Sequence, residues 1–173
     1  MTLQLPSILQ QYSVAAINRT LYEDGSRNVA LFGLGQLGGI PAELQKHRCV
    51  GSVNDAIKLF NSKLKSLVDD LNTNFPEATF TYINVYNILP IIGTLSVLDR
   101  PCCKVLETMT EGLCAPGEGP YLLRGIYLFY DNFHPTEIAN RVAANRAYNA
   151  LLPSDAHPMD IRHLIRNNHV YDD

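Results

Sequence analysis

Several features are missing from this sequence, and each absence narrows what the protein can be. No apolar run approaches the roughly 20 residues that a membrane-spanning helix requires, so no such helix is expected. Positive charge is not in excess, since 14 Lys and Arg stand against 17 Asp and Glu for a formal net charge of −3. That balance gives no electrostatic reason to expect nucleic acid or an anionic membrane as a partner. The opening residues, MTLQLPSILQQYS, lack a basic segment followed by an apolar one, so they do not predict a secretory signal.

Cysteine is sparse and shows no C-x-x-C spacing, which disfavours a zinc ribbon or a thioredoxin-like site. No cofactor or metal is expected. Of the four cysteines, Cys102, Cys103 and Cys114 cluster in one loop-like stretch and Cys49 stands apart. The cluster favours a disulfide, which implies an oxidising compartment. The missing signal sequence favours the opposite compartment, so the localisation stays open.

What is present is typical of a globular α/β domain. Hydrophobic residues make up 46% of the chain and charged residues 18%, and a length of 173 residues favours one domain. The patterns predict helices over 7–24, 52–73, 87–93 and 136–152, strands over 28–32 and 79–86, a long surface loop over 94–124, a short strand or helical turn over 126–130, and a polar tail over 153–173 with a short helix at 158–166.

Strands separated by helices predict a parallel sheet with helices on its faces. The helix over 52–73 is the clearest element, and Ser52 with Asp55 resembles a capping box at its start. Its predicted buried stripe is Ala56, Leu59, Phe60, Leu64, Leu67, Val68 and Leu71. Two or three strands make a small sheet for a chain of this length, which indicates that the chain is part of a larger unit.

The run Gly33–Gly38 fits the G-x-G-x-x-G dinucleotide fingerprint and follows a predicted strand. The context does not fit, because Pro41 stands where the phosphate-binding helix should already be running. No strand ending in an acidic residue follows about 20 residues later. A tight turn in which glycines allow close backbone approach explains the pattern better.

Two other motifs have ordinary explanations. Asn18 opens the sequon Asn-Arg-Thr, a possible glycosylation site only if the protein is secreted, and it lies in a predicted helix. The segment Gly51–Asp55 superficially resembles an oxyanion-hole asparagine motif. Because that segment opens a helix, we interpret it as a helix cap.

The most informative segment is DNFHPTE at 131–137, between a strand-like run and a helix. In α/β sheets, ligand chemistry is usually placed in such strand-end loops. An aspartate three residues before a histidine can bring its carboxylate against one imidazole nitrogen. The other nitrogen is then free to take a proton from a hydroxyl nucleophile. The spacing alone is common among surface residues and helix caps, and metal binding is not expected because no third ligand lies nearby.

Longer stretches of the chain are similar to the plant-type GDSL esterase/lipases, a branch of the SGNH hydrolases. They are residues 21–41, 49–72 and 78–89, the Cys pair at 102–103, and YLFYDNFHPTEIANRVAANRAYNA at 127–150. The resemblance implies a flavodoxin-like three-layer α/β/α fold and hydrolysis of carboxylic esters and lipids. It assigns Asp131 as the orienting acid and His134 as the general base. Residues 1–152 would be the C-terminal part of the hydrolase domain and 153–173 a tail, and the family is mostly secreted.

The departures from the family pattern concern the nucleophile and the cysteines. The family's serine in its Gly-Asp-Ser motif, and its oxyanion-hole Gly and Asn, precede the point where this chain begins to match. None of the eight serines here lies in a Gly-Asp-Ser context: 7, 13, 26, 52, 62, 66, 96 and 154. Where the family usually has cysteine, this chain has Gly39 and Tyr121. One bridge is left, from Cys102 or Cys103 to Cys114, with Cys103 and Cys114 as the assigned pair.

These departures predict weak activity for this chain alone. Removing a triad serine costs on the order of 10⁶-fold in rate, so an isolated Asp–His pair should hydrolyse esters little better than free imidazole. An incomplete sheet would also expose a strand edge and favour self-association. The alternative hypothesis is a non-catalytic relative that binds lipid or a full-length family member.

Overall fold

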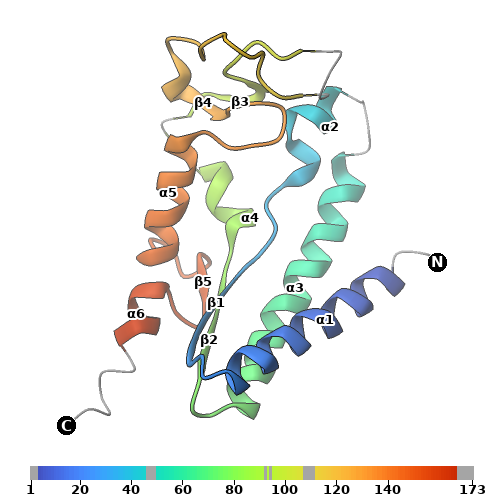
Figure 1. Cartoon of the computed structure of the whole chain (residues 1–173), viewed down its shortest axis with the longest axis vertical. Helices are drawn as coiled ribbons and strands as arrows, with labels where there is room; N and C mark the ends of the chain where they lie inside the picture. The colour runs from blue at the N-terminus through green and yellow to red at the C-terminus, as the bar shows by residue number, and fades with distance from the viewer. Residues whose placement is uncertain (1–3, 46–49, 92, 94, 107–111, 167–173) are drawn as a thin grey trace.

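A computed structural model describes residues 4–45, 50–91, 93, 95–106 and 112–166 of the chain. Helices and strands alternate along it, as Figure 1 shows, which confirms the predicted α/β class. The elements are α1 (Gln4–Glu23), β1 (Asn28–Phe32), η1 (Leu37–Gly39), α2 (Pro41–Gln45), α3 (Val50–Asn74), β2 (Thr79–Ile83), α4 (Val85–Ile88), η2 (Leu89–Ile91), β3 (Val97–Pro101), η3 (Arg124–Ile126), β4 (Tyr127–Phe129), α5 (Glu137–Tyr148), β5 (Ala156–His157) and α6 (Ile161–Arg166), where η marks a 3-10 turn.

The main sheet has three strands in the order β1-β2-β5. β1 and β2 are parallel, as predicted, and α3 lies between them in the chain. β2 is the central strand, and its residues Phe80 and Ile83 are fully buried. It is shorter than the predicted strand over 79–86, because Asn84 ends it: the Asn84 side chain caps α4 by accepting a hydrogen bond from the amide of Asn87.

Helices cover both faces of this sheet. α1 and α3 lie on one side, and α5 and α6 lie on the other (Figure 1). The larger core packs α3 against β1 and β2 through Leu31, Leu64, Leu67, Val68, Leu71, Ala78, Phe80 and Tyr82. On the opposite face, Ile83 packs with Ile88 and Ala147. Alternate residues of β2 therefore serve different cores, as the pleat of a strand buried on both faces requires.

The predicted stripe of α3 is right from Phe60 onward and wrong at Ala56 and Leu59, since Phe60 packs against the main core. Leu59 is 44% exposed and Ala56 is also exposed, whereas Ile57 is buried. The buried face includes a polar residue, Asn61, which the apolar pattern could not select. The capping box is wrong as well, because Ser52 lies inside α3 rather than at its start.

A second, two-stranded sheet pairs β3 with β4 in parallel. β3 lies within residues 94–124, so that stretch is not the uninterrupted surface loop predicted from its glycines and prolines. Leu128 and Phe129 of β4 pack with Leu95 and with Ala139 of α5. This small sheet lies at one end of the molecule (Figure 1), and the segment 131–137 follows directly from β4.

The C-terminal segment from residue 153 is packed on the domain as far as it is described. β5 pairs antiparallel with β2, so that His157 lies opposite Tyr82. Leu164 of α6 is buried, and Asp155 forms a buried ion pair with Arg146 of α5. The predicted polar tail thus contributes a strand, a helix and an ion pair to the fold.

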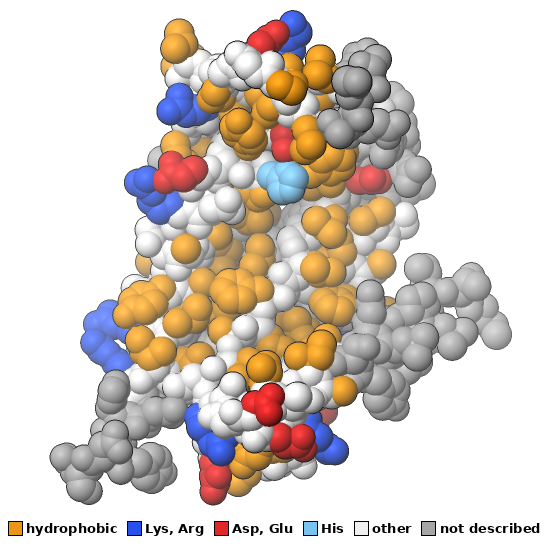
Figure 2. Space-filling view, in the orientation of Figure 1, with side chains coloured by type: hydrophobic (Ala, Val, Ile, Leu, Met, Phe, Trp, Pro, Cys, Tyr) orange, Lys and Arg blue, Asp and Glu red, His pale blue; other side chains and the backbone are white. Residues whose placement is uncertain are grey.

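The outer edge of β1 has no strand beside it within the described ranges. Phe32, at the end of β1, is 52% exposed, and Leu34 and Leu37 beyond it are also exposed. Figure 2 shows hydrophobic side chains across the middle of the face between α5 and α3. Of the helices that the structure describes, none has the length and apolar character needed to cross a bilayer.

Candidate active site

The loop after β4 is held closed at its base by backbone hydrogen bonds. The amide of Tyr130 donates to the carbonyl of His134 at 2.8 Å, and the amide of Thr136 donates to the carbonyl of Leu128 at 2.8 Å. The Thr136 hydroxyl also donates to the carbonyl of Tyr127 and caps α5 by accepting from the amide of Ala139. The residues 131–135 are therefore clamped between a strand end and a helix start.

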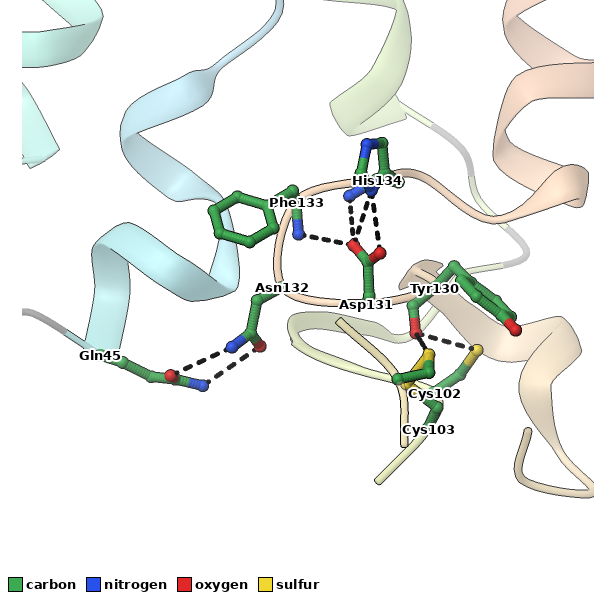
Figure 3. Close-up of a disulfide and its surroundings, with 9 residues drawn as sticks. Gln45, Cys102, Cys103, Tyr130, Asp131, Asn132, Phe133 and His134 are labelled. Atoms are coloured by element: carbon green, nitrogen blue, oxygen red, sulfur yellow. Dashed lines mark hydrogen bonds and ion pairs between the residues drawn. A yellow bond between two sulfur atoms is a disulfide. The ribbon is translucent and has the colours of Figure 1, made fainter. Parts of the chain in front are cut away.

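Asp131 is buried and organises this loop with one carboxylate. Its Oδ1 accepts hydrogen bonds from the amides of Phe133 at 2.8 Å and His134 at 2.7 Å. The same carboxylate contacts His134 Nδ1 at 3.0 Å through Oδ1 and 2.9 Å through Oδ2 (Figure 3). Sequence spacing predicted this contact. The hydrogen bonds from the two backbone amides fix the Asp131 carboxylate, so the imidazole meets an acceptor that is already oriented.

The ring of His134 is exposed to solvent, whereas the side chain of its partner Asp131 is buried. The His134 side chain is 68% exposed and that of Asp131 is 6% exposed. Because a carboxylate accepts at Nδ1, the neutral imidazole carries its proton there and leaves Nε2 with a free lone pair. That is the arrangement a general base needs toward a hydroxyl nucleophile.

A neighbouring residue that the sequence analysis did not select anchors the loop. Asn132 is buried, and its side-chain amide exchanges two hydrogen bonds with Gln45 of α2, each at 3.3 Å (Figure 3). Its backbone accepts from the amide of Ala42 and donates to the carbonyl of Gly112. The loop is thereby tied to α2, far away in the sequence. Only the tertiary structure reveals this partnership, since an Asn within a loop has no distinctive pattern.

A disulfide lies against the backbone where the Asp131–His134 loop begins. Cys103 is bonded to Cys114, and Cys102 is a buried free thiol. The Sγ atoms of Cys102 and Cys114 both lie 3.6 Å from the carbonyl oxygen of Tyr130, the residue before Asp131 (Figure 3). Burial raises the pKa of the Cys102 thiol, which keeps it protonated and able to donate to that oxygen. Cys49 lies outside the described residues.

A second Asp–His pair has the same spacing and was not predicted from the sequence. Asp160 is buried at the start of α6, and it contacts Nδ1 of His163 at 2.6 Å and the amide of that residue at 2.9 Å. Burial alone would raise the pKa of Asp160, but hydrogen bonds from His163 and Ala150 lower it overall. α6 lies near the opposite end of the molecule from β4 (Figure 1). The Asp160–His163 pair therefore provides a matched comparison for Asp131–His134.

The other sequence motifs have structural roles. An added Cβ at Gly33 would lie 2.6 Å from the Tyr82 hydroxyl, so this glycine is required by close approach. The side chain of Asn61 holds the backbone of the next residue, Leu34: it accepts a hydrogen bond from the Leu34 amide and donates one to the Leu34 carbonyl, both at 2.8 Å. Asn54 accepts from the amide of Gly38 at 3.0 Å. The glycine-rich run is thus a turn that hydrogen bonds hold against α3. Asn54 is the residue of the 51–55 motif that contributes one of these hydrogen bonds.

Asn18 does not present its amide for glycosylation in this structure. The side chain is 3% exposed, and Nδ2, the atom that would carry the glycan, donates to the carbonyl of Val14 at 2.8 Å. A sugar on that nitrogen would require α1 to move. In the described part of the chain, no group of three or more His, Cys, Asp or Glu is placed to hold a metal ion.

An apolar pocket adjoins the Asp131–His134 loop. Its volume is about 310 Å³, and Phe133 and Pro135, the residues on either side of His134, both line it. The remaining walls come from the loop between β1 and α2, from α4 and η2, and from the two strands of the small sheet. His134 itself is not among the residues that line the pocket.

Comparison with known proteins shows which family the chain resembles. Residues 2–147 match the sequence model of the family described as GDSL-like Lipase/Acylhydrolase. Three GDSL esterase/lipases of Arabidopsis thaliana are 41%, 42% and 42% identical to the chain over 171, 157 and 159 residues, which cover 90%, 84% and 86% of it. The chain covers 47%, 43% and 44% of these relatives, so it spans less than half of their length.

Proposed function

Because this chain belongs to the GDSL lipase/acylhydrolase family, we propose that it carries the acid–base pair of a carboxylic ester hydrolase. His134 is the general base, and Asp131 is the residue that orients and stabilises it. The observation that supports these roles is the contact between the buried Asp131 carboxylate and Nδ1 of the exposed His134 ring. His163 makes the same kind of contact, but it belongs to α6, which lies away from the carboxyl ends of β1 and β2 (Figure 1), where α/β sheets place their ligands.

The chemistry follows from the free Nε2. A serine hydroxyl attacks the ester carbonyl while Nε2 of His134 takes its proton, and the imidazolium then returns that proton to the departing alcohol oxygen. A water molecule hydrolyses the acyl-enzyme by the same two proton transfers. Asp131 stays ionised throughout and stabilises the imidazolium. The buried position of Asp131 strengthens this interaction because fewer water dipoles screen it.

The serine is the part of this mechanism that the 173 residues do not supply in a Gly-Asp-Ser setting. We therefore expect the chain by itself to hydrolyse esters at the level of free imidazole. We expect full activity when the N-terminal half of a relative is present, because the 173-residue chain already orients the general base, His134.

The test uses two proteins. The first is the 173-residue chain, assayed with p-nitrophenyl acetate beside free imidazole at equal concentration. The second, called here the hybrid enzyme, joins the N-terminal half of one of the Arabidopsis relatives to residues 1–173. We expect the chain to match imidazole and the hybrid enzyme to be far faster. His134→Ala should lower kcat of the hybrid enzyme by at least 10³-fold, and His163→Ala should leave it within about threefold. An active hybrid enzyme that is indifferent to His134→Ala would refute the proposal.

The edge of β1 that no strand of the described residues covers supports a second candidate, a non-catalytic binding role. Phe32 and Leu34 are exposed beside that edge, and unpaired strand edges bind other strands. In this case the chain would associate with itself, with lipid or with a full-length relative. Light scattering during size-exclusion chromatography distinguishes the outcomes, since a defined oligomer supports this role and a monodisperse monomer contradicts the self-association.

The Cys103–Cys114 disulfide further supports an oxidising compartment for the protein, because such bonds persist outside the reducing cytosol. Mass spectrometry of peptides from the native source under non-reducing conditions tests this. Recovery of both cysteines as free thiols would contradict it.

A further inference from the structure

Two different sets of hydrogen bonds hold the loop that carries Asp131 and His134. The bonds accepted by the Asp131 carboxylate run within residues 131–134, so they fix the geometry inside the loop. The bonds made by Asn132 run outward, and in Figure 3 its side chain points toward Gln45 and away from the other two residues. The first set orients the imidazole on its carboxylate, but it would be the same if the whole loop tilted about its base on β4 and α5.

Asn132 is placed to fix that tilt. Its side-chain oxygen accepts from Gln45 Nε2 and its side-chain nitrogen donates to Gln45 Oε1, each at 3.3 Å. Its backbone carbonyl accepts from the amide of Ala42 at 3.1 Å, and its backbone amide donates to the carbonyl of Gly112 at 2.9 Å. Because Asn132 is buried, a side chain that lost its partner would leave polar groups without hydrogen bonds inside the protein.

The two segments that Asn132 contacts are themselves fixed. Pro41 and Ala42 of α2 are buried, and Asn54 of α3 holds the turn before α2 by accepting from the amide of Gly38. On the other side, an added Cβ at Gly112 would lie 2.8 Å from Cβ of Asn132, so the two backbones are in direct contact. The loop therefore has a neighbouring backbone on one side and a hydrogen-bonded helix on the other.

From this arrangement we propose that Asn132 and Gln45 are positioning residues, whose paired amides set the tilt of the loop and so place Nε2 of His134 against the serine hydroxyl. The inference rests on the proposed function for the reaction, but the placement of the loop is measurable without turnover. Proton transfer needs the base within about 2.6–3.2 Å of the hydroxyl oxygen. A displacement of about 1 Å can cost on the order of 10²-fold in rate, so a tilt that leaves the Asp131–His134 contact intact would still slow the reaction.

The first test is a double-mutant cycle in the hybrid enzyme. Asn132→Ala and Gln45→Ala should each lower kcat by about 10- to 100-fold. KM should stay within about threefold, because the placement of the base affects the transition state rather than the binding of substrate. The double variant should be no slower than the slower single variant, since both changes break the same pair. Losses that multiply in the double variant, or a change in KM alone, would overturn the proposal.

Asn72 offers a matched control for the loss of a structural amide. Its side chain also makes two hydrogen bonds: it donates to the carbonyl of Phe80 at 2.9 Å and accepts from the amide of Phe80 at 2.8 Å. These bonds join α3 to β2 without contacting the loop, so Asn72→Ala should lower the urea midpoint and leave kcat within about threefold. A fall in kcat as large as that of Asn132→Ala would mean that general loosening slows the enzyme, and the proposal would fail.

The second test needs no turnover and uses amide hydrogen exchange, followed by NMR, on the 173-residue chain. In Asn132→Ala, the amides of Ala42 and of position 132 should exchange at least about tenfold faster than in wild type. The amides of Phe133 and His134 should keep their protection, because Asp131 still accepts from both. Nitrogen-15 shifts at alkaline pH should likewise show the proton of the neutral His134 ring still on Nδ1.

The outcomes separate this inference from the function on which it rests. Equal acceleration of all these amides, or loss of the Nδ1 proton in Asn132→Ala, would show that Asn132 maintains the inside of the loop, and would overturn its positioning role whatever the hybrid enzyme does. The expected exchange pattern in a chain whose hybrid enzyme is inactive would instead count against the proposed function.

Discussion

Asp131 accepts hydrogen bonds from both the backbone amide and the ring of His134, at 2.7 Å and 3.0 Å through the same oxygen. One carboxylate atom therefore sets the backbone turn and the orientation of the imidazole together. This coupling explains why three residues of loop suffice to build the pair. It also means that the turn and the base cannot be altered independently.

Replacing Asp131 with Asn should disable the base without removing it. An amide nitrogen facing Nδ1 favours the wrong tautomer, so kcat of the hybrid enzyme should fall on the order of 10⁴-fold. Asp160→Asn changes the equivalent residue of the second pair and should leave kcat within about threefold. Steady-state kinetics with p-nitrophenyl acetate measure both. A fall of less than tenfold for Asp131→Asn would remove Asp131 from the mechanism.

The ion pair between Arg146 and Asp155 should make stability depend on both partners. Arg146 is 5% exposed and Asp155 is fully buried, and Arg146 Nε donates to Asp155 Oδ2 at 3.0 Å. Arg146→Ala leaves that carboxylate buried and uncompensated, so unfolding in urea should show a loss of about 3–5 kcal/mol. Arg141→Ala, at an exposed position of the same helix, should cost less than about 1 kcal/mol.

The same carboxylate predicts the direction of acid sensitivity. Burial alone would raise the pKa of Asp155, but the hydrogen bond from Arg146 and those from the amides of Leu152 and Leu151 lower it below 3.8 overall. The unfolded chain then binds a proton more readily than the folded one. The contribution of Asp155 is therefore complete above pH of about 4 and is lost as pH falls through the folded pKa. Urea midpoints between pH 7 and pH 2.5 should converge for wild type and Asp155→Asn as the pH falls.

Tyr121 occupies a position from which a cysteine should reach Cys102. The amide of Tyr121 donates to the carbonyl of Cys102 at 2.7 Å, so the two backbones are adjacent. Tyr121→Cys should form a second disulfide and stabilise the protein by about 2–4 kcal/mol. Tyr121→Ser is the control, because it also removes the ring contact with Tyr127 without adding a thiol. Non-reducing peptide mapping and thermal unfolding are the measurements, and a free thiol at both positions would contradict the prediction.

Gly33 should not tolerate a side chain. An added Cβ would lie 2.6 Å from the Tyr82 hydroxyl and 3.0 Å from Asn61 Oδ1, and both residues are buried. Gly33→Ala should therefore destabilise by about 1–3 kcal/mol. Gly51→Ala, in an open position within α3, should instead stabilise by about 0.5–1 kcal/mol. Chemical denaturation of the two variants should show opposite signs, and equal midpoints would show that Tyr82 can move aside.

Local patterns predicted those parts of the fold that depend on neighbouring residues in the chain. β1 covers the predicted 28–32, and α3 extends the predicted 52–73 by a few residues at most. The errors arose where distant segments decide. β3 lies in a stretch rich in Gly and Pro, and it is a strand because β4 pairs with it. β5 is only two residues long and exists because β2 offers its edge.

For the candidate site, the sequence by itself determined which residues meet, because Asp131 and His134 are three positions apart and one loop brings them together. It also determined the family, since the similarity to GDSL esterase/lipases runs along most of the chain. Only the tertiary structure decided what surrounds the pair: Gln45 on Asn132, the sulfurs beside Tyr130 and the apolar pocket next to Phe133. The physical reason is the range of the interactions. A turn and its internal hydrogen bonds are specified by adjacent residues, whereas burial and cavity walls are specified by segments that meet only after the chain has folded.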